Sequence, residues 1–580
     1  MSEELRNGLD RRTFFALCTA SGLGGAVVPD VLWNRLQAQV PARTPGQGPP
    51  QAPAKITIEM VIGAEQVAGL QFSGAERDMM LQNLNNALQS FEQIRAVPLP
   101  NPVTPALVFH PLLPGRTPGI VDARPAKRAP RKVARPSGNG DLAFLGVASL
   151  AELVRTRQVT ATELTRLSLD RLKQYGSDLA CVVNLTEARA LRQAEQADRE
   201  IAAGKYRGPL HGIPWGAKDL LAVPDYPTTW GSPIYREQVL QETATVVERL
   251  DAAGAILVAK LSLGEFAQGD VWYGGTTKNP WNTQQGSSGS SAGPASATAA
   301  GLVPFAIGSE TMGSIVSPST RCGVTGLRPT FGRVSRYGAM ALSWTMDKLG
   351  PMARSVEDCA LVFAAIHGPD GKDPTVHAVP FPWDPGAPLS SVRVGFLKSA
   401  FDAERPGKAL DDAALEAMRG LGIPLVEIEM PKDLPVGALR MILSAEAAAA
   451  FDEITRTDKD DMMVRQMANA WPNSFRSARF IPAVEYIQAN RIRTLLMERM
   501  EEVFRQVDVF VTPSFGGNVL QITNYTAHPA VVLPSGFTAE GTPVSVSFIG
   551  RPFGEAALCL VAQKWQEATG WHLKRPAGYA

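Results

Sequence analysis

"GSSGSSAGPASATAAG" occupies residues 286–301, and "GSETMGSIVSPS" occupies residues 308–319. The first stretch has the Gly, Ser, Ala and Pro composition of a flexible linker. However, the apolar run "VPFAIG" at 303–308 lies between the two stretches and is typical of a buried strand. Glycines around Ser314 permit a tight turn that directs several backbone N–H groups to one point, where they can stabilise an oxyanion. The pattern therefore indicates a serine hydrolase with Ser314 as its nucleophile.

A nucleophilic serine needs a base, and the chain has only six histidines. The stretch "HGIPWGAKDLL" at 211–221 offers a lysine instead, Lys218, among apolar residues that include Ile213 and Trp215. Burial disfavours the charged ammonium, so it lowers the pKa of a lysine from its ordinary value of about 10.4. The stretch therefore offers Lys218 as a candidate base in a dry pocket, although a lone lysine is more often found at the surface.

The surrounding sequence predicts strands that alternate with helices. Beside 303–308, the runs "AILVA" (255–259), "DVFVTPS" (508–514) and "PAVVLPSG" (529–536) predict buried strands, and 187–203 predicts a long helix. "SLAE" (149–152) and "TATE" (160–163) match the capping box that begins a helix. Such alternation predicts an α/β sheet that helices cover on both faces.

Further motifs continue the pattern in order along the chain. They are the lysine stretch 211–221, the serine block 289–315, "CGVTGLRPTFGRVS" (322–335), "LGPMARSVEDCALV" (349–362) and the C-terminal segment 522–555. Together they resemble the amidase signature hydrolases. The resemblance implies the amidase signature fold over 141–576: one large, mostly mixed β-sheet between layers of α-helices in a single domain. It also implies hydrolysis of carboxylic amides, with esters, anilides and carbamates chemically open.

The resemblance implies which residues do the chemistry. The family's lysine falls on Lys218, its serine with a cis peptide bond on Ser290, and its nucleophile on Ser314. Its oxyanion hole falls on the N–H groups of Thr311, Met312, Gly313 and Ser314, and Ser291 supports the site. Neutral Lys218 would take a proton from Ser290, which would take one from Ser314, and Ser314 would form an acyl-enzyme.

The sequence departs from the commonest family pattern near the nucleophile. Glu310 replaces an aspartate, Met312 a glycine, Val316 an arginine, and Ala292 a glycine. The combination of Glu310 with Val316 is similar to the variant seen in bacterial peptide amidases. Without an arginine at 316, any substrate contact that this arginine would organise is lost.

Other interpretations of the sequence remain open at this point. Residues 289–293 also match GxSxG, which would make Ser291 the nucleophile and His528 or another late histidine its base. We expect no strand immediately before this motif, because "NTQQGSS" is polar. The same signature occurs in the amidase subunit of a tRNA-dependent amidotransferase. A third alternative is an inactive, secreted binding protein of this fold, which would require a broken triad, whereas all three members are present in this sequence.

The region before residue 141 predicts three segments. Arg11 and Arg12 precede a weakly apolar stretch, which predicts a twin-arginine signal peptide over 1–38 and hence an exported protein without a membrane anchor once the signal is removed. Residues 55–97 predict a helical extension. The proline-rich and basic segment 98–140 predicts an extended, solvated linker without a core of its own.

The net charge and the cysteine spacing limit the classes of partner that the protein is expected to bind. A formal net charge of +1 gives no bulk attraction to nucleic acid. The five cysteines are widely spaced, which favours neither a metal site nor a disulfide framework. We expect no cofactor and no metal, and a small-molecule amide as the only partner; the sequence leaves the oligomeric state open.

Overall fold

The computed structural model describes residues 55–103, 105–116, 118 and 131–579. The predicted signal peptide, 1–38, lies outside these residues. The chain divides into two compact units, Met1–Pro98 and Leu99–Ala580. Among the described residues, none of the helices has the length and apolar character needed to cross a membrane.

In the described part of the N-terminal unit, residues 55–98, there are two helices, α4 (Ile58–Ala68) and α5 (Gly74–Arg95). Ser73 begins α5 with a complete capping box, in which its hydroxyl accepts from the Glu76 N–H and the Glu76 carboxylate accepts from the Ser73 N–H. The helical extension predicted for 55–97 is thus a helical pair.

The large unit is built on an eleven-stranded mixed sheet, in the order β1-β3-β2-β8-β10-β9-β14-β15-β13-β11-β12. The strands are β1 Val182–Leu185, β2 Pro214–Lys218, β3 Ile256–Leu261, β8 Phe305–Glu310, β9 Thr325–Arg328, β10 Lys348–Ala353, β11 Val394–Leu397, β12 Leu425–Ile428, β13 Val509–Pro513, β14 Ala530–Phe537 and β15 Pro543–Gly550. Two hairpins stand apart from it: β4 (Val271–Trp272) with β5 (Gly275–Thr276), and β6 (Lys278–Asn279) with β7 (Asn282–Gly286). The predicted mixed sheet and its four predicted strands are confirmed.

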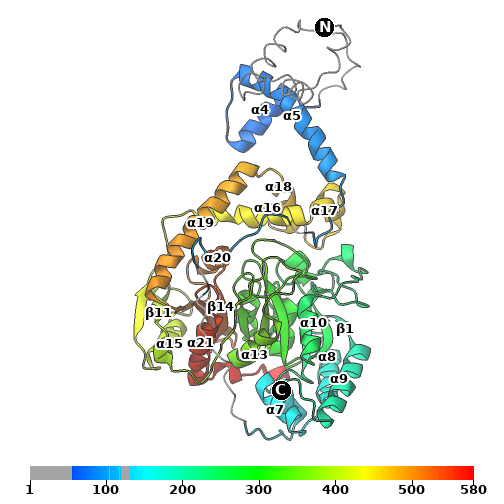
Figure 1. Ribbon diagram of the computed structural model, residues 1–580, viewed down its shortest axis with the longest axis vertical. Helices are drawn as coiled ribbons and strands as arrows, with labels where there is room; N and C mark the ends of the chain where they lie inside the picture. Colours follow the sequence, from blue (N-terminus) through cyan, green and yellow to red (C-terminus); the bar gives the residue numbers. More distant parts are fainter. Residues whose placement is uncertain (1–54, 104, 117, 119–130, 580) are drawn as a thin grey trace, which may run out of the picture. The chain divides into compact units, whose positions relative to one another are not determined.

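Helices cover both faces of this sheet (Figure 1). The helices described in the large unit are α6 Asn139–Ala143, α7 Val147–Arg155, α8 Ala161–Tyr175, α9 Glu187–Ala202, α10 Thr245–Ala252, α11 Ala292–Ala299, α12 Val316–Cys322, α13 Val356–Ile366, α14 Lys398–Asp402, α15 Lys408–Arg419, α16 Arg440–Ala450, α17 Asp452–Arg456, α18 Trp471–Ala478, α19 Ala483–Gln506, α20 Val519–Tyr525 and α21 Glu555–Thr569. Of these, α16, α17 and α18 pack on other helices rather than on the sheet. Side chains alternate between the faces of a strand. On β10, Met352 packs with α11 and α12, whereas Ala353 belongs to the larger core that contains α13 and α21.

One of the two predicted capping boxes is wrong. Thr160 caps α8 as expected, since its hydroxyl accepts from the Glu163 N–H at 3.0 Å. Ser149, by contrast, lies inside α7, which begins after Gly146. One free N–H group of α7, that of Ala148, instead donates to the carboxylate of Asp358 from α13 at 3.0 Å. A carboxylate 210 residues away in sequence therefore accepts a hydrogen bond at the start of α7, where the local motif predicted that Ser149 and Glu152 would cap the helix.

The prediction of a solvated linker over 98–140 is also wrong for its first part. Residues 99–116 belong to the large unit, and Asn101 is buried there. Phe109 packs edge-on against Phe331 of the large unit, with ring centroids 5.3 Å apart. The segment lacks a core of its own, but it packs on the core of the large unit.

Candidate active site

Lys218 ends the central strand β2, fully buried among three serine hydroxyls. Its Nζ lies 2.8 Å from Ser290 Oγ, 2.8 Å from Ser309 Oγ and 3.1 Å from Ser291 Oγ. A neutral lysine amine has two hydrogens and one lone pair, so it can donate to two of these hydroxyls and accept from the third. The site can therefore hold Lys218 as a proton acceptor.

Burial lowers the pKa of Lys218 well below its ordinary value. The carboxylates of Asp347 and Glu310 act in the opposite direction, and burial outweighs them. This shift is the one a base needs, because only the deprotonated amine accepts a proton at neutral pH.

Ser290 is the member of the serine-rich run that follows a cis peptide bond, Gly289–Ser290. Gly289 has no room for a side chain, since a Cβ there would lie 1.8 Å from the carbonyl oxygen of Gly269. The preceding pair has other partners: Ser287 Oγ donates to the Ser288 carbonyl at 2.8 Å, and Ser288 Oγ lies 2.7 Å from Ser317 Oγ. Ser290 thus differs from Ser287 and Ser288 in its hydrogen-bond partner, because the Ser290 hydroxyl contacts Lys218.

Ser291 links three parts of the site. Its N–H donates to the carbonyl of Ser314 at 3.1 Å. Its hydroxyl accepts from the Ser309 N–H at 3.1 Å and donates to the Ser309 carbonyl at 3.0 Å. Ser291 therefore fixes the start of α11 against the end of β8 and against the segment that carries Ser314.

These contacts argue against the GxSxG alternative, in which Ser291 attacks the substrate. The expectation that no strand precedes the motif was wrong, because the polar stretch 282–286 is strand β7. That strand pairs only with β6, outside the large sheet, so no central strand delivers Ser291 to an exposed turn. His528 is buried elsewhere, with its Nδ1 2.7 Å from Thr526 Oγ1, and burial lowers its pKa to about 3.

A turn joins β8 to α12 and carries Ser314. Gly313 has φ of 99°, a conformation that favours glycine. Within the described part of the chain, the N–H groups of Met312, Gly313 and Ser314 donate to no acceptor. Unpaired N–H groups in one turn are what an oxyanion hole requires. The side chain of Thr311 is fixed by a hydrogen bond, because its hydroxyl donates to the Asp347 carboxylate at 2.5 Å.

A buried network that the sequence did not predict supports this turn. Glu310 accepts from the N–H groups of Ile315 and Val316 at 2.8 and 2.9 Å, and Arg328 pairs with it at 2.7 Å. Burial opposes ionisation of Glu310, but Arg328 and Lys348 outweigh it and lower its pKa to about 2. An ionised Glu310 thus anchors the first turn of α12, directly after Ser314.

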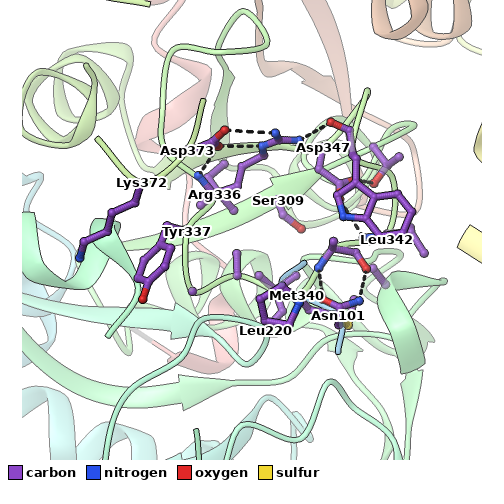
Figure 2. Close-up of a pocket in the computed structure, with 18 of the residues that line it drawn as sticks. Asn101, Leu220, Ser309, Arg336, Tyr337, Met340, Leu342, Asp347, Lys372 and Asp373 are labelled. Atoms are coloured by element: carbon purple, nitrogen blue, oxygen red, sulfur yellow. Dashed lines mark hydrogen bonds and ion pairs between the residues drawn. The ribbon is translucent and has the colours of Figure 1, made fainter. Parts of the chain in front are cut away.

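A cavity of about 200 Å³ opens beside the site (Figure 2). Ser309, whose hydroxyl contacts Lys218, and Thr311 of the proposed oxyanion turn line the cavity, whereas Lys218, Ser290 and Ser314 do not. Most of its other lining side chains are apolar, including Leu220, Met340 and Leu349. Sequence reasoning missed Ser309, although alternation along β8 could have found it. Within the described residues, no cluster of His, Cys, Asp and Glu is arranged to hold a metal ion.

Comparison with known proteins agrees with this architecture. The amidase family model matches residues 163–559. The A subunit of glutamyl-tRNA(Gln) amidotransferase from Methylococcus capsulatus is 35% identical over 487 residues, which cover 75% of this chain and 99% of that protein. Its counterpart from Heliobacterium modesticaldum is 35% identical over 477 residues, 74% of this chain and 97% of that protein. The native peptide amidase of Stenotrophomonas maltophilia superposes with a TM-score of 0.67 at 29% identity, covering 74% of this chain and 98% of that one.

The fold and the site together are those of an α/β hydrolytic enzyme with a buried lysine and a serine-rich turn. The chain belongs to the amidase family, whose members act on carbon–nitrogen bonds.

Proposed function

We propose that this protein hydrolyses carboxylic amides through an acyl-enzyme on Ser314. The observation that carries the proposal is the 2.8 Å contact between buried Lys218 and Ser290, next to the turn that presents Ser314. Neutral Lys218 accepts the Ser290 proton while Ser290 accepts the Ser314 proton, and Ser314 Oγ attacks the carbonyl carbon. The N–H groups of residues 311–314 stabilise the oxyanion. The proton returns to the leaving nitrogen, and water then hydrolyses the ester.

The cavity beside Ser309 supports an uncharged, apolar acyl group. Its two cationic side chains already have partners: Arg336 pairs with Asp373 at 3.0 Å, and Lys372 pairs with Glu248 at 2.9 Å. These ion pairs offset the positive charge that the two side chains would present to a substrate carboxylate. Burial raises the pKa of Asp347, so this lining carboxyl is a weaker site for a substrate ammonium than an exposed aspartate.

The second candidate is the amidase subunit of a tRNA-dependent amidotransferase. The curated relatives favour it over a free-standing amidase, because both relatives described above carry the name of a glutamyl-tRNA(Gln) amidotransferase subunit. The first step would be the same, with glutamine as the amide. The paired cations of the cavity favour the free-standing amidase, since glutamine carries a carboxylate.

The two candidates differ in substrate and in the need for a partner. The purified full chain, alone and without ATP, should hydrolyse uncharged amides or anilides from a panel that also contains esters, carbamates and glutamine. Glutamine hydrolysis that appears only with a partner subunit would favour the second candidate. An intact, folded protein that turns over no member of the panel, with or without a partner, would favour an inactive binding protein of this fold.

The serine run offers a prediction with internal controls. Ser290→Ala removes the hydroxyl that contacts Lys218 and that the proposed relay requires, so it should lower kcat by about 10²–10⁴-fold without changing the melting temperature greatly. Ser288→Ala, whose hydroxyl contacts Ser317 instead, should stay within about threefold of wild type. Ser291→Ala should fall between them, because it loses one of the three hydroxyls around Lys218. A Ser291→Ala enzyme far worse than Ser290→Ala would contradict the assignment.

A further inference from the structure

A segment before the family-matching region forms part of the cavity wall. The family model begins at residue 163, yet Asn101 and Pro102 line the cavity together with Ser309 and Thr311. We call residues 99–103 and 105–116 the strap. The strap therefore contributes to the site from outside the range that the family model matches.

Asn101 attaches the strap to the cavity wall through its side chain. Its Nδ2 donates to the Ala341 carbonyl at 2.8 Å, and its Oδ1 accepts from the Ala341 N–H at 2.7 Å (Figure 2). Ala341 itself lines the cavity. Only a primary amide of this length both donates and accepts in this way. Asn101 is 9% exposed, so the pair of bonds is protected from water.

Contacts further along hold the rest of the strap on the large unit. The guanidinium of Arg493 lies 3.5 Å from the centre of the Phe109 ring. Arg493 is buried and also donates to the Thr345 carbonyl at 2.9 Å, next to the cavity residue Trp344. Arg116 pairs with Glu501 of α19 at 3.5 Å. The strap is therefore fastened beyond its lining residues and behaves as part of the wall.

We propose that Asn101 and Pro102 set the size of the acyl pocket, so that compact apolar acyl groups fit and longer ones are excluded. The inference rests on the proposed amide hydrolysis. The cavity of about 200 Å³ is little larger than an engineered apolar cavity of about 150 Å³ that binds benzene. A single aromatic ring fits this volume with room to spare, whereas a biphenyl group is larger and makes closer contact with the wall that includes Asn101 and Pro102.

The test compares two sizes of ligand in the full-length protein. Calorimetry in a Ser314→Ala background, which binds the amides without hydrolysing them, gives the ratio of Kd for biphenyl-4-carboxamide to Kd for benzamide. With Ser314 present, mass spectrometry gives the ratio of Ser314 labelling rates for a short-chain and a long-chain alkyl fluorophosphonate. Wild type should prefer the smaller member of each pair. Asn101→Ala, which removes the two hydrogen bonds that fix the strap to the cavity wall at Ala341, should reduce both preferences by about tenfold, within the range by which pocket contacts discriminate substrates.

Two further variants make the result interpretable. Pro102→Ala removes lining atoms without touching the Asn101–Ala341 bonds, so it should reduce the preferences even if Asn101→Ala folds poorly. Val103→Ala is the matched control on the same segment; Val103 is 50% exposed and should leave both ratios unchanged. Unchanged ratios in Pro102→Ala and in folded Asn101→Ala would overturn the inference. Absent labelling of Ser314 in wild type, with a shifted Kd ratio in the variants, would overturn the proposed hydrolysis and leave the role of the strap in place.

Discussion

Ser314→Ala should reduce amide hydrolysis by at least about 10⁴-fold, because the variant has no atom to form the acyl-enzyme. Removing the nucleophilic serine of a hydrolytic triad has an effect of this order, and the remaining rate comes from substrate binding and the oxyanion hole. Ser314 is partly exposed, so the loss of its hydroxyl should leave the melting temperature nearly unchanged. Initial rates on the best amide of the panel, with thermal melting beside them, measure both effects.

The matched control for this variant is Ser317→Ala. Ser317 lies in the first turn of α12, three residues after Ser314, and its hydroxyl contacts Ser288 rather than Lys218. Its alanine variant should keep a rate within about threefold of wild type. If Ser314→Ala kept substantial activity while Ser317→Ala lost it, the nucleophile would have been assigned to the wrong serine.

Lys218→Met should lower kcat by about 10²–10⁴-fold, which is the usual contribution of a general base. Methionine has a similar length and suits the dry environment, so this variant should remain folded. Lys218→Ala should lose at least as much activity and, in addition, leave a cavity. Propylamine is small enough to enter that cavity and should restore part of the rate in Lys218→Ala but none in Lys218→Met.

The pH dependence gives an independent test of Lys218. Burial lowers its pKa, and the amine acts as a base only when it is deprotonated. In the wild type, kcat/KM should therefore rise with pH through this lowered pKa and then level off. In Lys218→Met the rising limb should disappear from the residual rate. A wild-type rate in Lys218→Met, or an unchanged rising limb, would assign the base to another group.

Much of the fold could be predicted because its strands are locally apolar. The strands β3, β8, β13 and β14 are short buried runs, and each was found from composition alone. The strand β7 was missed because its five residues are polar and pair in a hairpin outside the large sheet. The start of α7 was misplaced because its partner, Asp358, comes from another part of the chain.

Some residues of the site could likewise be predicted from the sequence, and others could not. Lys218, Ser290 and Ser314 lie in stretches whose order and spacing carry a recognisable pattern, and the structure brings Lys218 and Ser290 into contact. Arg328 and Asn101 could not be predicted, since nothing near them in sequence indicates their partners. Glu310 was noted only as a departure from the family pattern, and its ion pair with Arg328 emerges only when β8 and β9 enter the same sheet. Asn101 likewise pairs with a residue 240 positions away.

The most direct test of the central claim is to map the covalent intermediate. An aryl carbamate transfers its carbamoyl group to a nucleophilic serine quickly, and the carbamoyl-enzyme is hydrolysed slowly. Such a reagent should add one carbamoyl group to the wild-type protein, and peptide mass spectrometry should place this group on Ser314. The adduct should form at least about 10²-fold more slowly in Ser290→Ala and Lys218→Met, because both lack part of the proton relay. An adduct on Ser290 or Ser291, or steady amide hydrolysis by a protein in which Ser314 is never modified, would contradict the account.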